Sequence, residues 1–241
     1  MPSLLHVVGI LTILCNTILA QEDADVLTPL QWQALDHSVE EGLAWLASQQ
    51  QPDGSFPTMP QGQPGVTSLC IMAFLAHGHL PGEGDYGDNL NRSLQFTLRC
   101  QKPSGLIALV APGGDKLVRS VDHVIGNTAT YNHAIASLML SEAYAMSGGE
   151  DAKELSESIE HALSVTLEMQ LFPKARSVDE GGWRYLDIHH DGIESDLSVT
   201  GWQLMFLRSA KNAGFDVASE PIEKAVKYVT HCFSREFNTF G

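Results

Sequence analysis

Polar side chains stand at the start of three otherwise apolar stretches, where they could contact a ligand. If these stretches are helices, their N-termini carry partial positive charge, and an anionic group such as a diphosphate could bind there. Ser, Thr, Asp and Asn are also common helix N-caps, so a purely structural role stays open for each. The residues are Thr67 and Ser68 in the first stretch; Tyr131, Asn132 and His133 in the second; and Asp196, Ser198 and Thr200 in the third.

An aromatic and basic run, Trp183-Arg184-Tyr185, follows the pair Gly181-Gly182. Such a run favours packing between neighbouring units of the fold. The alternative is an aromatic surface that stabilises carbocations or stacks on sugars.

No set of side chains has the spacing of a zinc site, and we expect neither a metal nor another cofactor. His189-His190-Asp191 could bind a metal on a surface loop, but adjacent histidines point apart. Beyond residue 20 the cysteines number three, so no complete disulfide framework is possible. A bridge between Cys100 and Cys232 is one option, whereas Cys70 lies in an apolar stretch and is expected to be buried.

Helical periodicity predicts the elements that carry these residues. Amphipathic helices are expected at residues 28–50, 90–101 and 151–170, each followed by an apolar helix at 66–76, 132–146 and 198–213. Thr28 and Gln31 can form a capping box at the first of them. A fourth amphipathic helix carries Ile222, Val226 and Val229, and the chain ends within that fourth hairpin.

The hairpins share a sequence register, which indicates a true repeat. A glutamine, a glycine four residues later and an apolar residue two positions further recur as Gln50, Gly54 and Phe56 and as Gln101, Gly105 and Ile107. The third copy has Gln170, Gly181 and Trp183, with an insertion before the glycine. The apolar helices align with an offset of 66 residues, which pairs Ala134 with Thr200. The sequence therefore predicts an all-α array, with each apolar helix inside and each amphipathic helix outside.

This Gln-x-x-x-Gly-x-aromatic pattern resembles the QW repeat of squalene and hopene cyclases. The stretch 181–205 is similar to bacterial secreted proteins of the prenyltransferase/squalene oxidase repeat family, and the resemblance covers residues 30–241. It implies an α/α toroid, here incomplete with about three and a half hairpins. The apolar helices would surround a central cavity, with the polar residues at their N-termini and Trp183, Arg184 and Tyr185 near its rim.

The net charge and the N-terminal segment indicate which partners and which location to expect. With 29 acidic and 14 basic residues the net charge is −15, which argues against nucleic acid as a partner. Residues 1–20 have the form of a secretory signal peptide cleaved near Ala20, so we expect export and no membrane span after cleavage. Residues 21–27 would then be a linker and residues 28–241 the repeat domain.

Three functional hypotheses follow. The resemblance implies an isoprenoid, or another apolar small molecule, as the ligand of the cavity. The acidic Asp-x-Asp-Asp motif of the cyclases and the zinc ligands of the protein prenyltransferases do not occur in these residues, so catalysis is left open. The second hypothesis is a secreted, non-catalytic binding or assembly module whose protein partner is unknown. A third, a polysaccharide lyase-like toroid, needs a basic residue near the substrate, for which Arg184 is the candidate.

Overall fold

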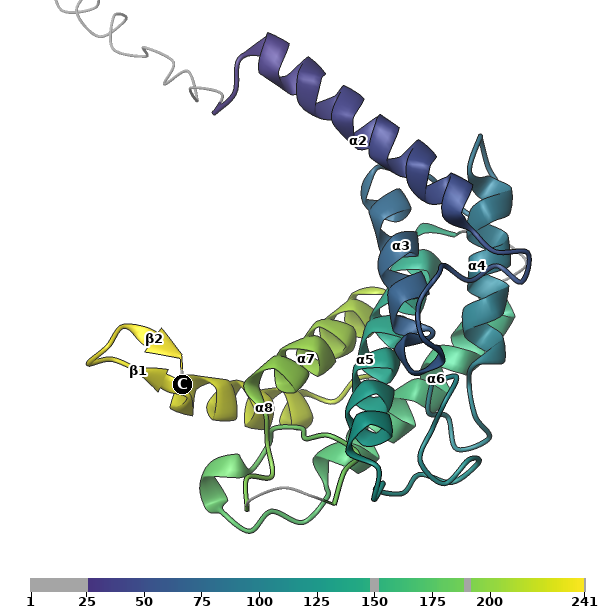
Figure 1. Cartoon of the computed structure of the whole chain (residues 1–241). Helices are drawn as coiled ribbons and strands as arrows, with labels where there is room; N and C mark the ends of the chain where they lie inside the picture. The colour runs from purple at the N-terminus through teal and green to yellow at the C-terminus, as the bar shows by residue number, and fades with distance from the viewer. Residues whose placement is uncertain (1–25, 148–151, 189–191, 241) are drawn as a thin grey trace, which may run out of the picture. The chain divides into compact units, whose positions relative to one another are not determined.

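The computed structural model describes residues 26–147, 152–188 and 192–240. Within them the chain forms seven α-helices and one two-stranded antiparallel sheet, which confirms the expected all-α fold (Figure 1). The closed ring implied by the cyclase resemblance stays a prediction. The chain divides into two units, the first ending at Gly42 and the second beginning at Leu43.

The first unit contains the start of α2 (Pro29–Gln49). Thr28 and Gln31 form the expected capping box. The Thr28 N–H donates to Gln31 Oε1 at 2.8 Å, and the Gln31 N–H donates to Thr28 Oγ1 at 3.4 Å. These two bonds satisfy backbone donors that the first helical turn leaves unpaired.

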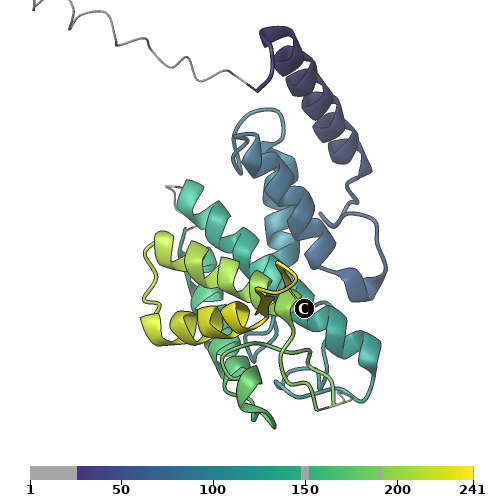
Figure 2. The ribbon, with the colours of Figure 1, turned by 90° about the vertical axis from the view of Figure 1, so that its left-hand side faces the viewer.

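The second unit alternates apolar and amphipathic helices, as the periodicity predicts. Helices α3, α5 and α7 contact one another in that order, and each also contacts the amphipathic helix that follows it (Figure 1, Figure 2). The buried apolar residues join in one core between the two sets of helices. The helices are α3 (Gly65–Ala76), α4 (Gly87–Arg99), α5 (His123–Met146), α6 (Ala152–Gln170), α7 (Leu197–Asn212) and α8 (Ser219–His231), with short 3₁₀ turns η1 (Pro60–Gly62) and η2 (Ser177–Asp179).

A glutamine clamp recurs at the end of three amphipathic helices. In each, the glutamine Nε2 donates to the carbonyl of its own turn glycine and to a backbone carbonyl in the first turns of the next amphipathic helix. The donor distances are 3.3 and 2.8 Å for Gln50, 3.1 and 2.9 Å for Gln101, and 2.8 and 2.9 Å for Gln170. One amide thus fixes both the turn and the following hairpin, which is why the pattern requires glutamine.

The clamp glycines lie directly against the next amphipathic helix. Gly54, Gly105 and Gly181 all have positive φ, between +88° and +95°. A Cβ on Gly105 would lie 2.6 Å from the carbonyl oxygen of His161, and the other two glycines meet the backbone of Arg92 and Lys224 in the same way. Glycine is therefore required by conformation and by space.

The second apolar helix is longer than the sequence indicates, so the prediction that it begins at Asn132 was wrong. Helix α5 begins at His123, and the Asp122 carboxylate accepts from the Ile125 N–H at 3.2 Å. Tyr131, Asn132 and His133 therefore lie inside the helix and are not at its N-terminus. The sequence of the first turns of α5 resembles a loop because several of these residues are polar. They are helical because they pack against a distant segment, where Gly126 contacts the Leu186 backbone.

Removal of this cap tests the corrected start of α5. We expect Asp122→Ala to lower the free energy of unfolding by about 1 kcal/mol, the usual value of an N-cap. The measurement is urea unfolding, with Asp115→Ala in the preceding loop as the control. If the helix began at Asn132, the two substitutions would have equal effects.

The chain after α8 forms a turn that the sequence reading missed. Strands β1 (Phe233–Ser234) and β2 (Thr239–Phe240) pair, with Phe233 opposite Phe240, as Gln101 is opposite Ile107 in an earlier turn. Asn238 has a φ of +50° and takes the place of the clamp glycine. The disulfide considered between Cys100 and Cys232 is not formed. Both are free thiols, as is Cys70. Among the described helices, none is both long and apolar enough to cross a membrane.

Candidate functional site

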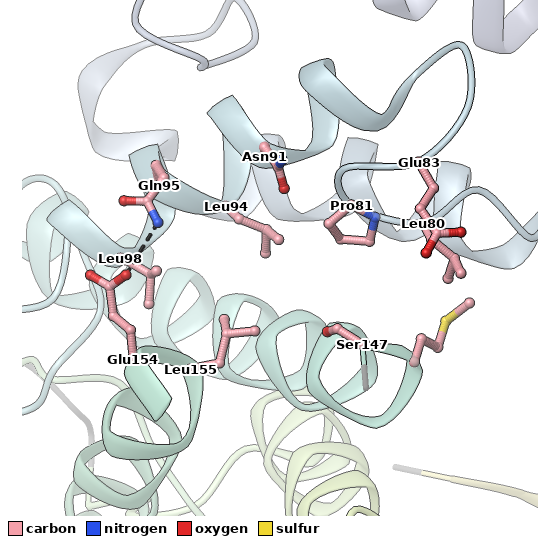
Figure 3. Close-up of a pocket in the computed structure, with 11 residues that line it drawn as sticks. Leu80, Pro81, Glu83, Asn91, Leu94, Gln95, Leu98, Ser147, Glu154 and Leu155 are labelled. Carbon is pink, nitrogen blue, oxygen red and sulfur yellow. Dashed lines mark hydrogen bonds between the residues drawn. The ribbon is translucent and has the colours of Figure 1, made fainter. Parts of the chain in front are cut away.

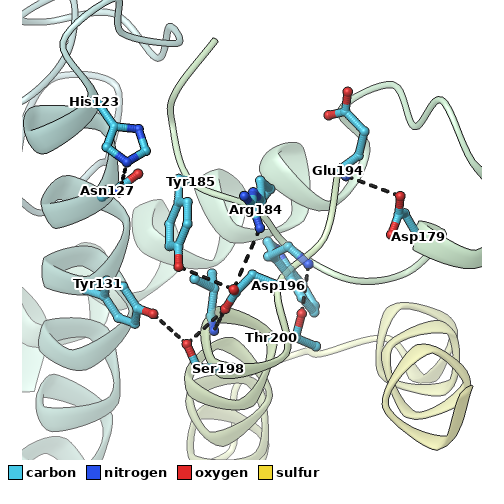
Figure 4. Close-up of polar contacts among 12 residues, drawn as sticks. His123, Asn127, Tyr131, Asp179, Arg184, Tyr185, Glu194, Asp196, Ser198 and Thr200 are labelled. Carbon is cyan, nitrogen blue, oxygen red and sulfur yellow. Dashed lines mark hydrogen bonds and ion pairs between the residues drawn. The ribbon is translucent and has the colours of Figure 1, made fainter. Parts of the chain in front are cut away.

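Four of the candidate polar residues meet at the N-terminal end of α7 (Figure 4). The hydroxyls of Tyr131 and Ser198 form a hydrogen bond between α5 and α7. Asp196 is the N-cap of α7 and accepts from the Val199 N–H at 3.0 Å, from Ser198 Oγ at 2.9 Å and from Tyr185 Oη at 3.3 Å. The expected capping role of Asp196 is therefore confirmed, but the carboxylate also organises the surrounding side chains.

Arg184 completes this group, which we call the polar cluster: Tyr131, Arg184, Tyr185, Asp196 and Ser198. Arg184 lies 3.7 Å from Asp196 and 4.7 Å above the Tyr185 ring. The Tyr131 and Tyr185 rings lie 5.8 Å apart. Burial raises the pKa of Tyr185, and its hydrogen bond to Tyr131 and the nearby Asp196 charge raise it further. The tyrosine therefore stays a neutral hydrogen-bond donor.

Thr67, His133 and Thr200 are equivalent positions in the three hairpins. Each side chain accepts the backbone N–H of the apolar residue that follows a clamp glycine. The donors are Phe56, Ile107 and Trp183, at 3.0, 3.2 and 3.0 Å respectively. All three acceptors are fully buried, so their role is to hold the turns against α3, α5 and α7. This equivalence corrects the offset of 66 residues between the last two helices to 67.

His133 is the one titratable member of this set, and burial lowers its pKa to about 3. Because Nδ1 accepts from Ile107, the proton of the neutral ring is on Nε2, which lies 3.1 Å from Thr166 Oγ1. Thr166 in turn donates to Gln203 Oε1 at 3.0 Å. A charged imidazolium would lose its acceptor role towards Ile107, so His133 is a structural group.

The remaining candidates lie apart from the polar cluster. Asn132 connects α5 to the start of α3, because its Oδ1 accepts from the Gly65 N–H at 3.0 Å and its Nδ2 donates to the Gln61 carbonyl at 2.7 Å. Ser68 is fully buried in α3, and its hydroxyl has no partner among the described residues. Trp183 is also fully buried and donates from Nε1 to the Thr166 carbonyl at 2.7 Å. Packing, the first interpretation of Trp183, is confirmed.

A charged group within the insertion of the third repeat was missed. Arg176 donates twice to the buried Asp179 at 2.8 Å, and Lys174 Nζ donates to the Glu194 carbonyl at 2.6 Å. Burial raises the pKa of Asp179, but the Arg176 hydrogen bonds, the Glu194 N–H and the charges of Arg176 and Lys174 together outweigh it, and the net shift is downward. Burial also lowers the pKa of Lys174 to about 8. These contacts fix the loop that carries Arg184 and Asp196. They span up to 20 residues, so no local pattern could reveal them.

A partly exposed set of apolar side chains was also missed. When the three helices are aligned at Thr67, His133 and Thr200, the residues two and five positions later lie on one face of α3, α5 and α7. Leu69 and Met205 are 43% and 45% exposed, while Ile135 and Leu138 on the middle helix are nearly buried by their neighbours. We call this set the apolar face: Leu69, Ile135 and Trp202 at one position, and Met72, Leu138 and Met205 at the other.

The described residues contain no group of three His, Cys, Asp or Glu side chains able to hold a metal ion. His189-His190-Asp191 lies outside the residues that the structure describes. Comparisons of the chain with protein-family models, curated proteins and solved structures find no match. The relationship to cyclase and prenyltransferase repeats therefore stays a prediction from the sequence.

Proposed function

We propose that this protein is a repeat-built binding module that holds an apolar ligand, such as an isoprenoid, on the apolar face of α3, α5 and α7. The observation that carries the proposal is the continuity of this face across three equivalent helices. Exposed leucine and methionine side chains in register with a partly buried tryptophan favour a surface that binds a ligand or partner.

The polar cluster supports the same proposal. The hydrogen bond between Tyr131 and Ser198 lies one helical turn before Ile135 and Trp202, so the apolar face has a polar end. An elongated ligand with one polar terminus matches this distribution. Its terminus would contact the tyrosine hydroxyls and Arg184, and its chain would cover Leu69 and Met205.

Binding rather than catalysis is proposed because the polar groups near this face are engaged with one another. The Asp196 carboxylate accepts three hydrogen bonds and faces the Arg184 cation, and His133 is buried and neutral. The polysaccharide lyase hypothesis gains no support, because the guanidinium of Arg184 is beside the Asp196 carboxylate. A non-catalytic assembly role stays compatible with the same surface.

Charges on the apolar face test the proposal. We expect Leu69→Glu and Met205→Glu each to weaken binding of farnesol, used as the probe, by about tenfold or more, because an apolar contact is replaced by a charge. Quenching of tryptophan emission measures binding, and mass spectrometry of solvent extracts identifies any co-purified isoprenoid. Leu171→Glu, at a site 76% exposed after α6, is the control. Farnesol binding that is absent, or equal in all variants, would refute the proposal.

A further inference from the structure

A groove lies between α4 and the beginning of α6, and the proposed function does not use it. Its volume is about 610 Å³, within the range of small-ligand sites. Leu94 and Leu98 of α4, Leu155 of α6 and Leu80 of the loop after α3 supply its apolar lining (Figure 3). We call it the lateral groove.

The repeat supplies an internal comparison. A second groove of about 420 Å³ is lined by Leu163 and Leu167, which precede clamp residue Gln170 by the same intervals as Leu94 and Leu98 precede Gln101. Phe215 also lines this second groove, and its ring lies 5.1 Å from that of Tyr144. The second groove therefore contains a phenyl group of the chain itself.

None of the described residues that line the lateral groove is aromatic, which leaves room for an aromatic group from outside. Its charge is also one-sided. Glu83 and Glu154 stand at opposite ends in Figure 3, and the lining residues that the structure describes include no Lys, Arg or His. Glu154 accepts from Gln95 Nε2 at 3.2 Å, which orients that carboxylate beside the groove. The chain as a whole carries a net charge of −15.

We propose that the lateral groove binds a small arylalkylamine, a ligand with one aromatic ring and one protonated amine. The ring would lie on the four leucines, as Phe215 lies in the second groove. The ammonium group would lie at one end, within reach of Glu83 or Glu154, where a carboxylate favours a cation over a neutral or anionic group. This site lies between different helices from the apolar face, so either proposal can fail alone.

Three probes with the same ring and chain length test the ligand class: 4-phenylbutylamine, 4-phenylbutanol and 4-phenylbutyrate. Binding is measured on the purified protein by amide chemical-shift titration at low salt. We expect the amine to bind most tightly, the alcohol less tightly and the acid least, with shifts at Leu94, Leu98 and Leu155. Equal affinities for amine and acid, or shifts elsewhere, would overturn the proposal.

Variants then test the groove itself. The double variant Glu83→Gln and Glu154→Gln should weaken amine binding by about threefold, through the one solvent-exposed carboxylate that the ammonium faces, and leave the alcohol unchanged. Glu160→Gln, in the second groove, is the matched control. Asn91→Trp and Ser147→Trp each fill the lateral groove from a different element and should abolish binding of both probes. Circular dichroism identifies a variant that fails to fold, and binding that persists in the folded blocked variants would overturn the proposal.

Discussion

Replacement of Gly105 by alanine is expected to destabilise the protein by about 3 kcal/mol or more, because the change combines positive-φ strain with a backbone clash. Gly105 has a φ of +91°, and a Cβ there would lie 2.6 Å from the carbonyl oxygen of His161. Relief of that overlap requires α6 to move away from the turn, which would also break the hydrogen bonds of Gln101. The measurement is the free energy of unfolding in urea.

Gly78 is the matched control for this prediction. Its φ is +85°, nearly that of Gly105, but a Cβ there would have no neighbour within 4 Å. Gly78→Ala should therefore show the conformational cost alone, about 1 kcal/mol. If the two substitutions cost the same, the close approach of Gly105 to the next helix would contribute nothing to stability, which would contradict the prediction.

The pH dependence of stability should be steep in acid because of His133. Its pKa is about 3 in the folded protein and near 6.5 when exposed. Above pH 6.5 both states are neutral at this site, and the group has no effect. Between these values the unfolded chain binds a proton that the native state does not. The free energy of unfolding therefore decreases by about 1.4 kcal/mol for each unit by which the pH is lowered.

The variant His133→Thr isolates this effect. At the equivalent positions, Thr67 and Thr200 accept the corresponding backbone N–H with a threonine hydroxyl. The variant should lose stability at neutral pH through the smaller side chain, roughly 1–3 kcal/mol. Its stability should nevertheless fall less steeply between pH 6.5 and 4. The carboxylates are common to both proteins and cancel in the difference. Two parallel profiles over that interval would contradict the assignment of His133.

Local signals predicted much of the fold. Four helices begin and end within two residues of their expected bounds, because Pro29, Asp196 and glycines such as Gly78 and Gly214 mark their ends. The first turns of α5 were missed because Gly126 and its polar neighbours resemble a loop. They are helical because Gly126 packs on the Leu186 backbone, a contact that local propensity cannot contain.

The candidate site was predicted in part. Tyr131, Arg184, Tyr185, Asp196 and Ser198 were all named from the sequence, and they do lie together. Thr67, His133, Thr200 and Trp183 were also named, but they hold the turns and are buried. The two groups differ in burial. The burial of a residue depends on which face of its helix packs inward, and that face can be predicted once the hairpins are aligned in the correct register.

The glutamine clamp also bears on how such a chain can change in length. Each clamp connects a hairpin to the next one along, through one amide and one glycine. A duplicated or deleted segment that runs from one clamp to the next would leave every junction chemically identical to those already present. Homologous chains should therefore differ by whole hairpins, and insertions within a hairpin should fall between glutamine and glycine, as the third repeat already shows.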